Sequence, residues 1–361
     1  MSLIDNPLDR TAMASGKENE SKSTPIKAND CIQLELLGSS FRPEFTHQCF
    51  PNEVLPGGPQ EIRVQLAPSG RSCAVSSKRR KLETMAETVL SLEQIREHIS
   101  LALPPITDST ADDFLEQPVG DVQKEYSRGS DSFVVSMASG PEPYHNLVQP
   151  LALWFIETAD AVELTSDWKV WYLWKKHGDD KFSLVGYVTL FHFSSPFRKP
   201  RAGTVVRICQ VLLLPPYQRQ GHGRVLLECV YDYARSTESI VEVNVEDPAP
   251  SFTALRNKVD YELYHERVGL EALTDERVEA LMNETKLTKR QLVLVHEMNQ
   301  YRTCSENNDE KEFRLRVKRR LNREHKEELG GLDGDKDAMK ALLSKYYEEQ
   351  VTGYRAIVSK K

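Results

Sequence analysis

Runs of hydrophobic residues in the middle of the chain predict a series of strands interrupted by one helix. Two of these runs flank a polar turn at 177–180, a pattern typical of a β-hairpin, and a third stops abruptly at Pro215. Residues 223–236 then repeat apolar side chains at helical spacing. The strand-like runs occupy residues 151–176, 182–193, 205–214 and 240–246. This order of elements indicates an α/β (α+β) domain.

Other patterns flank this centre. Residues 31–37 have the character of a strand, and residues 91–94 form a capping box that opens a helix. From about residue 252 onward the apolar spacing is helical, with a second capping box at 288–291. Within that region the highly charged segment 310–329 predicts exposed helices.

These patterns divide the chain into four parts. Residues 1–28 carry Ser, Lys, Glu, Asn and Thr without apolar periodicity, which predicts a disordered tail. We expect an N-terminal α/β domain at 29–145, a central α/β domain at 146–255 and a helical C-terminal domain at 256–361.

Composition narrows the class of protein. The 361 residues are 39% hydrophobic and 28% charged, which suits a protein with a substantial core. No stretch approaches the roughly 20 apolar residues of a membrane helix, and the first 28 residues are too polar for a signal peptide. The six cysteines are scattered without a paired framework or a metal clip. We therefore expect no membrane, no metal, and a place in the cytosol or nucleus.

The net charge of −7 favours a basic peptide over nucleic acid as a partner, because nonspecific nucleic-acid binding needs a basic face. Two basic runs stand against this background. The run at 78–81 suits either a nuclear-import signal or a solvated loop. The run at 314–323 suits an acidic partner, nucleic acid or, because glutamates interleave with it, a solvated face.

A glycine loop at 218–223, with the sequence QRQGHG, lies between a predicted buried strand and an amphipathic helix. Such a loop leaves backbone N–H groups unpaired at a helix N-terminus, where they attract phosphate oxygens. Gly221 and Gly223 remove side chains that would block close approach. A Walker loop would need Gly-Lys-Ser/Thr, and the dinucleotide fingerprint lacks its third glycine because Leu226 stands there. A phosphate site of another family remains, with a plain tight turn as the alternative.

The loop matches the pattern Gln/Arg-x-x-Gly-x-Gly/Ala of the GCN5-related N-acetyltransferases, the GNAT family. Over about residues 30–300 the chain resembles the type B histone acetyltransferase catalytic subunits of that family. The segments that carry the likeness are FRPEFTHQCF at 41–50, LWFIETAD at 153–160, VGYVTLFHF at 185–193, CQVLLLPPYQRQGHGRVLLE at 209–228 and VEDP at 245–248. Three features depart from the family pattern: Arg219 stands where glycine is expected, 201–206 looks like a short insertion, and the loop at 70–90 is unusual.

The resemblance implies a GNAT fold, with a mixed sheet flanked by helices, and acetyl-CoA as co-substrate bound by the domain at 146–255. The pyrophosphate of the coenzyme would lie on the loop, and strand backbone would pair with its pantetheine arm. The residues implied for this role are Val211, Leu212, Leu213, Gln218, Arg219, Gln220, Gly221, His222, Gly223 and Arg224. His222 as a base and Cys209 as an acyl-carrying nucleophile are alternatives, and a structural role is favoured for both.

An acceptor lysine has a pKa near 10.4 and must lose a proton before its amine attacks a thioester. If residues 240–246 form a regular strand, Glu242, Asn244 and Glu246 share one face. The resemblance implies that Glu246 is the general base, with Asp247 and Glu157 as acidic helpers. From the residues alone, the same stretch also suits a polar exit from a strand into a turn.

The resemblance further implies the substrate and the partners. The substrate would be lysines in the N-terminal tail of newly made histone H4, with histone 2A as a second candidate. Its groove would be lined by Phe191, His192 and Phe193, and Asn52 and Glu53 would touch the same peptide. A WD-repeat histone-binding chaperone subunit would be the partner. The protein would then occur in both cytoplasm and nucleus.

Two other functions remain open from the sequence. An acetyltransferase of small amines would share the loop but need no extended peptide groove. A non-catalytic histone-binding chaperone subunit would account for the charged C-terminal helices and the basic run at 78–81.

Overall fold

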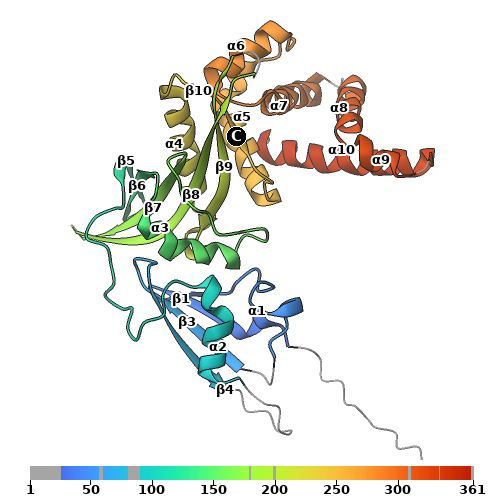
Figure 1. Cartoon of the computed structure of the whole chain (residues 1–361). Helices are drawn as coiled ribbons and strands as arrows, with labels where there is room; N and C mark the ends of the chain where they lie inside the picture. Colours follow the sequence, from blue (N-terminus) through green and yellow to red (C-terminus); the bar gives the residue numbers. More distant parts are fainter. Residues whose placement is uncertain are drawn as a thin grey trace, which may run out of the picture.

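The chain folds into two β-sheets and a C-terminal group of helices (Figure 1). The computed structural model describes residues 26–56, 60–79, 90–178, 180–197, 201–307, 310–332 and 334–358. Most of the tail expected at 1–28 lies outside these residues, as do Arg80 and Lys81 of the first basic run. Within the described residues, no helix combines the length and the apolar character that a membrane crossing requires.

The N-terminal part is built on a four-stranded sheet in the order β2-β1-β3-β4. Strands β1 and β3 are parallel, and the other pairs are antiparallel. Its elements are α1 Ala28–Cys31, β1 Ile32–Leu36, β2 Ser39–Phe41, η1 Pro51–Glu53, β3 Gln60–Leu66, β4 Cys73–Arg79, α2 Leu92–Ile99 and η2 Ser100–Ala102. The strand expected at 31–37 is therefore confirmed. The capping box of α2 is confirmed too, because Ser91 and Gln94 exchange both hydrogen bonds.

The central part is a six-stranded sheet in the order β10-β9-β8-β7-β6-β5. Its elements are β5 Asp121–Arg128, β6 Asp131–Ser139, α3 Pro143–Val148, η3 Gln149–Trp154, β7 Trp168–His177, β8 Lys181–Ser195, β9 Gly203–Leu213, η4 Pro215–Tyr217, α4 His222–Ser236 and β10 Ile240–Val245. Consecutive strands from β5 to β9 are antiparallel, so the hairpin expected around 177–180 is confirmed. Strand β10 is parallel to β9, and α4 provides the crossover between them.

The sheet extends beyond the domain boundary expected at residue 146. Strands β5 and β6 precede that residue, yet β6 pairs with β7 along its whole length, from Ser132 opposite Lys176 to Ser139 opposite Lys169. The six-stranded sheet thus begins at Asp121. The start of this domain is set by backbone pairing between β6 and β7. Local sequence patterns do not predict which strands pair with one another, so they could not locate it.

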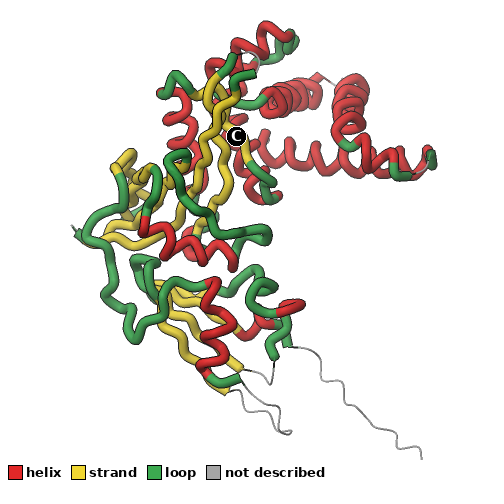
Figure 2. Tube along the Cα trace, viewed as in Figure 1, coloured by secondary structure: helices red, strands yellow, loops and turns green. Residues whose placement is uncertain are grey.

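The C-terminal part is helical, as expected from residue 252 onward. It comprises α5 Pro250–Val268, α6 Asp275–Thr285, α7 Lys289–Asn307, α8 Glu310–Glu324, α9 Lys326–Gly330 and α10 Lys336–Val358. These helices lie to one side of β10, away from the N-terminal sheet (Figure 2). The capping box expected at 288–291 forms only in half. The hydroxyl of Thr288 accepts a hydrogen bond from the Gln291 backbone, but the Gln291 side chain donates to buried Asp260 at 2.6 Å.

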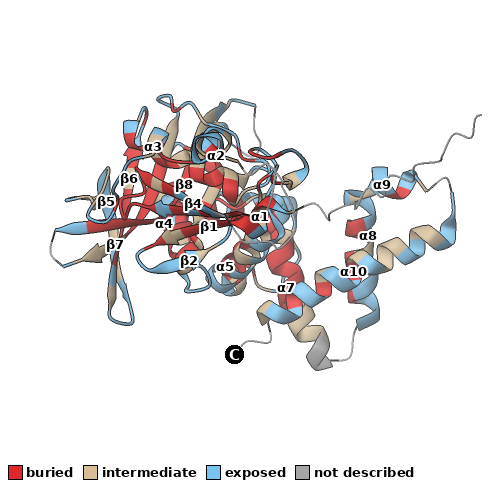
Figure 3. Cartoon of the chain, turned by 90° about the horizontal axis from the view of Figure 1, so that it is seen from below, coloured by how far each residue is buried: buried red, intermediate tan, exposed pale blue. Residues whose placement is uncertain are grey.

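The expectation that the charged segment 310–329 forms only exposed helices is corrected by α8. One face of this helix is buried, through Phe313, Val317, Arg320 and Leu321, and the other faces solvent (Figure 3). Arg320 is 7% exposed because its guanidinium forms two hydrogen bonds of 2.9 Å with the carboxylate of Glu297 on α7. The bidentate carboxylate offsets the cost of burying this charge.

Candidate active site

The two strands at the edge of the central sheet separate part-way along their length. Strand β10 pairs with β9 as far as Val245 opposite Ile208, and one further bond joins the Glu246 N–H to the Ile208 carbonyl at 3.0 Å. Strand β9 continues along β8 to Leu213 without β10 beside it. Within the described stretch 201–307, the edge of residues 209–213 that faces away from β8 therefore has no partner strand. Such an edge offers backbone donors and acceptors to an extended ligand.

Cys209 lies at the point of separation. Thr189 of β8 pairs with Gln210 and Leu190 pairs with Ile208, so Cys209 is the extra residue of a β-bulge. Burial raises the pKa of its thiol to about 12, and the neighbouring Glu246 carboxylate contributes to this rise. A thiol in this state is protonated at neutral pH, which argues against the role of acyl-carrying nucleophile.

Residues 218–224, which we call the amide loop, connect the end of β9 to the first turn of α4. Gly221 has φ +86°, in the left-handed region that favours glycine. No described residue accepts a hydrogen bond from the backbone N–H groups of 219–224. A Cβ on Gly223 would lie 2.9 Å from Leu255 of α5, so glycine also lets α5 pack closely there. The loop thus presents free amides at the positive end of a helix, the arrangement that binds phosphate.

The side chains of the amide loop hold its shape. Gln218 donates to the Leu213 carbonyl at 2.9 Å and Gln220 to the Pro216 carbonyl at 2.7 Å. Arg224 pairs with Glu228 at 2.6 Å and with Glu262 of α5. These three side chains, which belong to residues predicted to bind the coenzyme, therefore bond to other parts of the protein. The backbone amides of 219–224 remain available to bind a ligand.

Arg219 has φ +60°, which explains why the family pattern carries glycine at this position. An arginine adopts this conformation at some cost in backbone strain, and its side chain is exposed.

His222 begins α4 and is 1% exposed. Its Nδ1 lies 2.6 Å from the hydroxyl of Tyr126 on β5, and its ring packs 4.4 Å from that of Phe133 on β6. Burial lowers the pKa of the imidazole, and the nearby Arg128 guanidinium lowers it further. His222 therefore fixes the start of α4 against the sheet as a neutral group.

Arg128 at the end of β5 is a residue that sequence reasoning missed. Its Nη2 would lie 3.4 Å from a Cβ placed on Gly221, so a guanidinium stands beside the amide loop. No local pattern singles it out, because Arg128 is distant from the loop in sequence and only the sheet order brings the two together.

The three strand residues predicted to contact the coenzyme through their backbone lie on the free edge of β9. Leu212 is 1% exposed and belongs to the core, as expected for its side chain. Val211 and Val188 line a small apolar cavity whose other walls include Leu226 of α4 and Phe252 of α5. This cavity lies between β8 and β9 of the sheet and the helices α4 and α5, and its volume of about 10 Å³ leaves room for little more than one water.

Glu246 stands at the exit of β10 with its side chain 52% exposed. Its carboxylate lies 3.6 Å from Nη1 of Arg207. The Arg207 guanidinium in turn lies 5.0 Å from the ring centre of Phe193. The predicted base is thus held at the surface by a cation that stacks on an aromatic ring.

The other two predicted acidic residues are also exposed, and Asp247 has φ +32° in the turn after β10. No described hydrogen bond or ion pair joins Glu157 to Glu246. The WFIE segment is nevertheless placed close to β9, because Gln210 donates to the Asp160 carbonyl at 2.8 Å.

The FTHQCF segment packs on the same region. The Glu44 N–H donates to the Trp154 carbonyl at 2.8 Å, and the Gln48 side chain donates to the Ala159 carbonyl at 2.9 Å. Segments around residues 46, 157 and 210, far apart in sequence, are therefore neighbours.

The strand residues predicted to bind the substrate lie on two opposite faces of the sheet. Phe191 pairs across the sheet with Arg207, so Phe191 and Phe193 share the face that carries the ion pair to Glu246. His192 points to the opposite face, where its Nε2 lies 3.1 Å from the Tyr233 hydroxyl of α4.

Asn52 and Glu53 lie in the N-terminal part, within η1. The Glu53 carboxylate accepts from the Thr46 N–H at 2.9 Å and so holds the turn that follows FTH. No described hydrogen bond, ion pair or ring contact joins these two residues to Phe191 or Phe193.

Comparison with known proteins agrees with this geometry. Residues 139–253 match the model of the acetyltransferase (GNAT) family. The central part of the chain is a GNAT acetyltransferase domain. Its mixed sheet with flanking helices is the GNAT fold, and acetyltransferases of this family use acetyl-CoA. Within the described residues, no group of three or more His, Cys, Asp or Glu side chains is placed to hold a metal ion.

Relatives extend the likeness beyond this domain. The chain is 25% identical over 334 residues to the histone acetyltransferase type B catalytic subunits of Rattus norvegicus and Homo sapiens, and each alignment covers 81% of this chain and 79% of the relative. The protein of the same name from Mycosarcoma maydis is 31% identical over 236 residues, which cover 61% of this chain and 51% of the relative.

Proposed function

We propose that the chain transfers acetyl groups from acetyl-CoA to lysine side chains of histones, with the N-terminal tail of newly synthesised H4 as the principal substrate and histone 2A as a second. The names of the relatives support the substrate class. The acidic charge of the chain, −7, suits a basic tail.

The single observation that carries this proposal is the position of Glu246. It lies where β10 separates from β9, so a coenzyme seated with its pyrophosphate on the amide loop and its arm along 211–213 would end near this carboxylate. The free amides of 219–224 suit the phosphate, and the unpartnered backbone edge of 209–213 suits the arm.

Acetyl-CoA would supply an activated acetyl thioester. Glu246 would accept the proton of the lysine ammonium, and the neutral amine nitrogen would then attack the acetyl carbon directly. The C–S bond would break, CoA would leave as its thiolate, and the second proton lost from the nitrogen would convert that thiolate to the thiol. Arg207 would orient the Glu246 carboxylate through their ion pair. Asp247 and Glu157 would add negative charge that attracts the lysine. Phe191 and Phe193, on the same face, would contact the aliphatic part of the substrate.

Replacement of Glu246 by Gln tests the role of the base. We expect the turnover number to fall about 10²-fold or more at pH 7.5, because general bases contribute on that scale, while the Kd for acetyl-CoA stays within about twofold. The matched control is Glu238→Gln, which changes an exposed carboxylate in the turn before β10. A turnover number for the Glu246 variant equal to that of the control between pH 6 and 9 would remove Glu246 from this role.

The acceptor is tested separately. Initial rates with an H4 tail peptide, a histone 2A tail peptide and spermidine should show kcat/KM highest for H4. A preference for spermidine would instead identify a small-amine acetyltransferase. Calorimetry with CoA addresses the non-catalytic alternative, because a pure histone-binding subunit would release no heat of binding.

A WD-repeat histone-binding chaperone subunit remains our proposed partner, and cytoplasm and nucleus our proposed locations. The basic run at 78–81 would provide the import signal, and its first residue, Lys78, is exposed at the end of β4. Affinity purification of the tagged chain, with mass spectrometry of the bound proteins, tests the partner. Imaging of a variant with residues 78–81 changed to alanine tests the import signal.

A further inference from the structure

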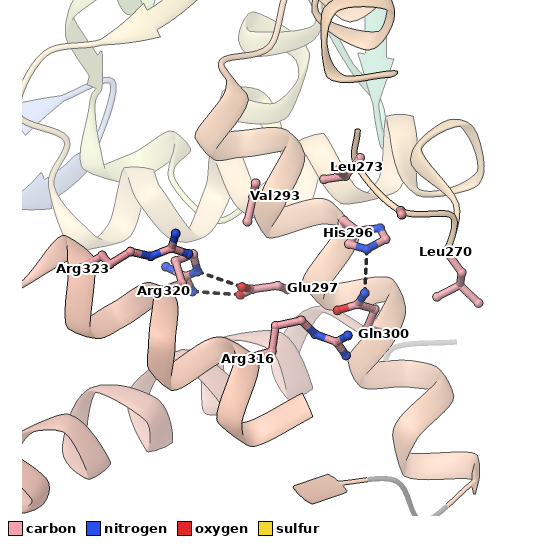
Figure 4. A pocket seen from close by; sticks show the side chains of 10 residues that line it. Leu270, Leu273, Val293, His296, Glu297, Gln300, Arg316, Arg320 and Arg323 are labelled. Atoms are coloured by element: carbon pink, nitrogen blue, oxygen red, sulfur yellow. Dashed lines mark hydrogen bonds and ion pairs between the residues drawn. The ribbon is translucent and has the colours of Figure 1, made fainter. Parts of the chain in front are cut away.

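A second candidate binding site lies in the C-terminal helices, in a part of the chain that acetyl transfer does not use. A cavity of about 410 Å³ opens between α7, α8 and the connection from α5 to α6 (Figure 4). Its size falls within the range of small-molecule sites. The residues that line it are Leu270, Ala272, Leu273, Val293, His296, Glu297, Gln300, Arg316, Arg320 and Arg323. We call it the arginine cavity.

Three arginines of α8 face this cavity because they are spaced four and three residues apart, on one side of the helix. Arg320 is already neutralised by its bidentate pair with Glu297, which also accepts a 2.6 Å hydrogen bond from the Tyr354 hydroxyl. The pair fixes the floor of the cavity.

The other two arginines are weakly engaged. Arg316 has an ion pair with Glu312 only at 4.0 Å, and both side chains are largely exposed. Arg323 forms no ion pair with any residue that the structure describes. Among the residues that line the cavity, the three guanidinium groups face one carboxylate, that of Glu297. Glu312 and Glu324 lie outside the lining and pair with Arg316 and Arg320, so a small dianion would bind between Arg316 and Arg323 on the cavity side of α8.

The wall formed by α7 contains an acceptor that lacks a donor. The Gly269 carbonyl, 3.2 Å from His296 Nδ1, can only accept, so that nitrogen carries the proton. His296 Nε2 therefore accepts from the amide nitrogen of Gln300 at 2.6 Å. This arrangement leaves Gln300 Oε1 buried without a hydrogen-bond partner in the structure. A buried acceptor of this kind is stabilised by a ligand O–H group or by water that accompanies a ligand.

The remaining wall is apolar. Leu273, Ala272 and Val293 line it, and Leu270 at its rim is 51% exposed. In Figure 4 the arginines lie on the α8 side and Leu270 and Leu273 on the side of the α5–α6 connection. An occupant that satisfies both sides carries charge at one end and an apolar group at the other.

We propose that the arginine cavity binds a small dianion with an apolar substituent, of the phosphomonoester class. The phosphate would accept hydrogen bonds from Arg316 and Arg323, a water bound to the phosphate would donate to Gln300 Oε1, and the apolar group would lie against Leu270 and Leu273. An acidic peptide is the less suitable occupant, since glutamates 312 and 324 flank the arginines and would repel an extended chain of carboxylates. This inference is independent of the proposed acetyl transfer.

The test uses the full chain, phenyl phosphate and inorganic phosphate as probes, and isothermal titration calorimetry. Saturating acetyl-CoA is present throughout, so that the amide loop does not contribute. We expect phenyl phosphate to bind at least about tenfold more tightly than inorganic phosphate, because its ring buries apolar surface. Equal affinities, or no binding of phenyl phosphate, would overturn the proposal.

Variants locate the site. Arg316→Ala and Arg323→Ala should each weaken phenyl phosphate binding by about tenfold, as expected for loss of one charge-assisted contact. The matched control is Arg319→Ala, which removes an exposed arginine of α8 that does not line the cavity. Arg320 is left intact because its loss would strand buried Glu297. Equal effects of all three variants would contradict the proposal, as would a glutamate-rich hexapeptide that binds more tightly than phenyl phosphate.

Discussion

The amide loop and the arginine cavity both offer hydrogen-bond donors to an anion, but they are made from different parts of the polypeptide. In the loop the donors are backbone N–H groups of 219–224, held by Gly221 and by the start of α4. In the cavity they are the side chains of Arg316 and Arg323 on a helix that also packs a buried face. The first site is fixed when the backbone folds, whereas the second depends on how the surrounding helices meet.

This difference has energetic consequences. Backbone amides lose no side-chain entropy when they bind, and their orientation is set in advance. Arginine side chains lose rotamer freedom on binding, and salt screens their charge. The loop suits a ligand whose reactive end must be placed accurately. The cavity suits recognition by charge and by apolar contact.

The largest loss of acetyl-CoA affinity should come from a substitution that blocks the amide loop with a side chain. Gly221→Val forces a β-branched residue into the left-handed region and places a side chain where phosphate would lie. We expect the Kd for acetyl-CoA to rise about 100-fold, equivalent to roughly 2.7 kcal/mol, with phenyl phosphate binding in the arginine cavity unchanged. Calorimetry measures both.

The control for backbone strain is Gly178→Val. Gly178 also has positive φ, in the β7–β8 turn, and nothing lies within 4 Å of a Cβ placed there. Both variants should lose thermal stability, but only the first should lose affinity for acetyl-CoA. If Gly178→Val weakened the coenzyme as much as Gly221→Val does, strain rather than access would explain the effect.

A smaller effect should follow from Arg128→Ala. This variant tests whether the positive charge of a side chain contributes to anion binding at the amide loop. The guanidinium stands beside Gly221, so its loss should weaken acetyl-CoA binding by about three- to tenfold at low salt. The difference should shrink in about 0.5 M KCl because exposed charges are screened. Arg267→Ala, an exposed arginine on α5, is the control. A salt-independent loss would mean that Arg128 acts by packing on Tyr126.

Much of the central fold follows from local patterns. The hairpin of β7 and β8, the strand that ends at Pro215 and the helix that starts at the glycine loop can each be located from periodicity and turn residues. The amide loop was predictable for the same reason, because its donors belong to consecutive residues. The positive φ of Arg219 even accounts for the glycine that the family pattern carries there.

Features of the site that depend on contacts between distant segments could not be predicted from the sequence. Arg128 reaches the loop only because β5 lies in the same sheet as β9. Arg207 is an ordinary strand residue until pairing places it between Phe193 and Glu246. The resemblance places His192 in the substrate groove with Phe191 and Phe193, but strand alternation directs its side chain to the face of the sheet that α4 covers.

The central claim is that the separated strands and the amide loop seat the coenzyme with its thioester beside Glu246. A crystal structure of the chain with acetyl-CoA tests it most directly. We predict pyrophosphate oxygens within hydrogen-bond distance of the amides of 219–224, and the thioester carbonyl at the gap between β9 and β10, close to the Glu246 carboxylate. Coenzyme bound elsewhere with the loop empty, or a Glu246 side chain directed away from the thioester, would contradict the account.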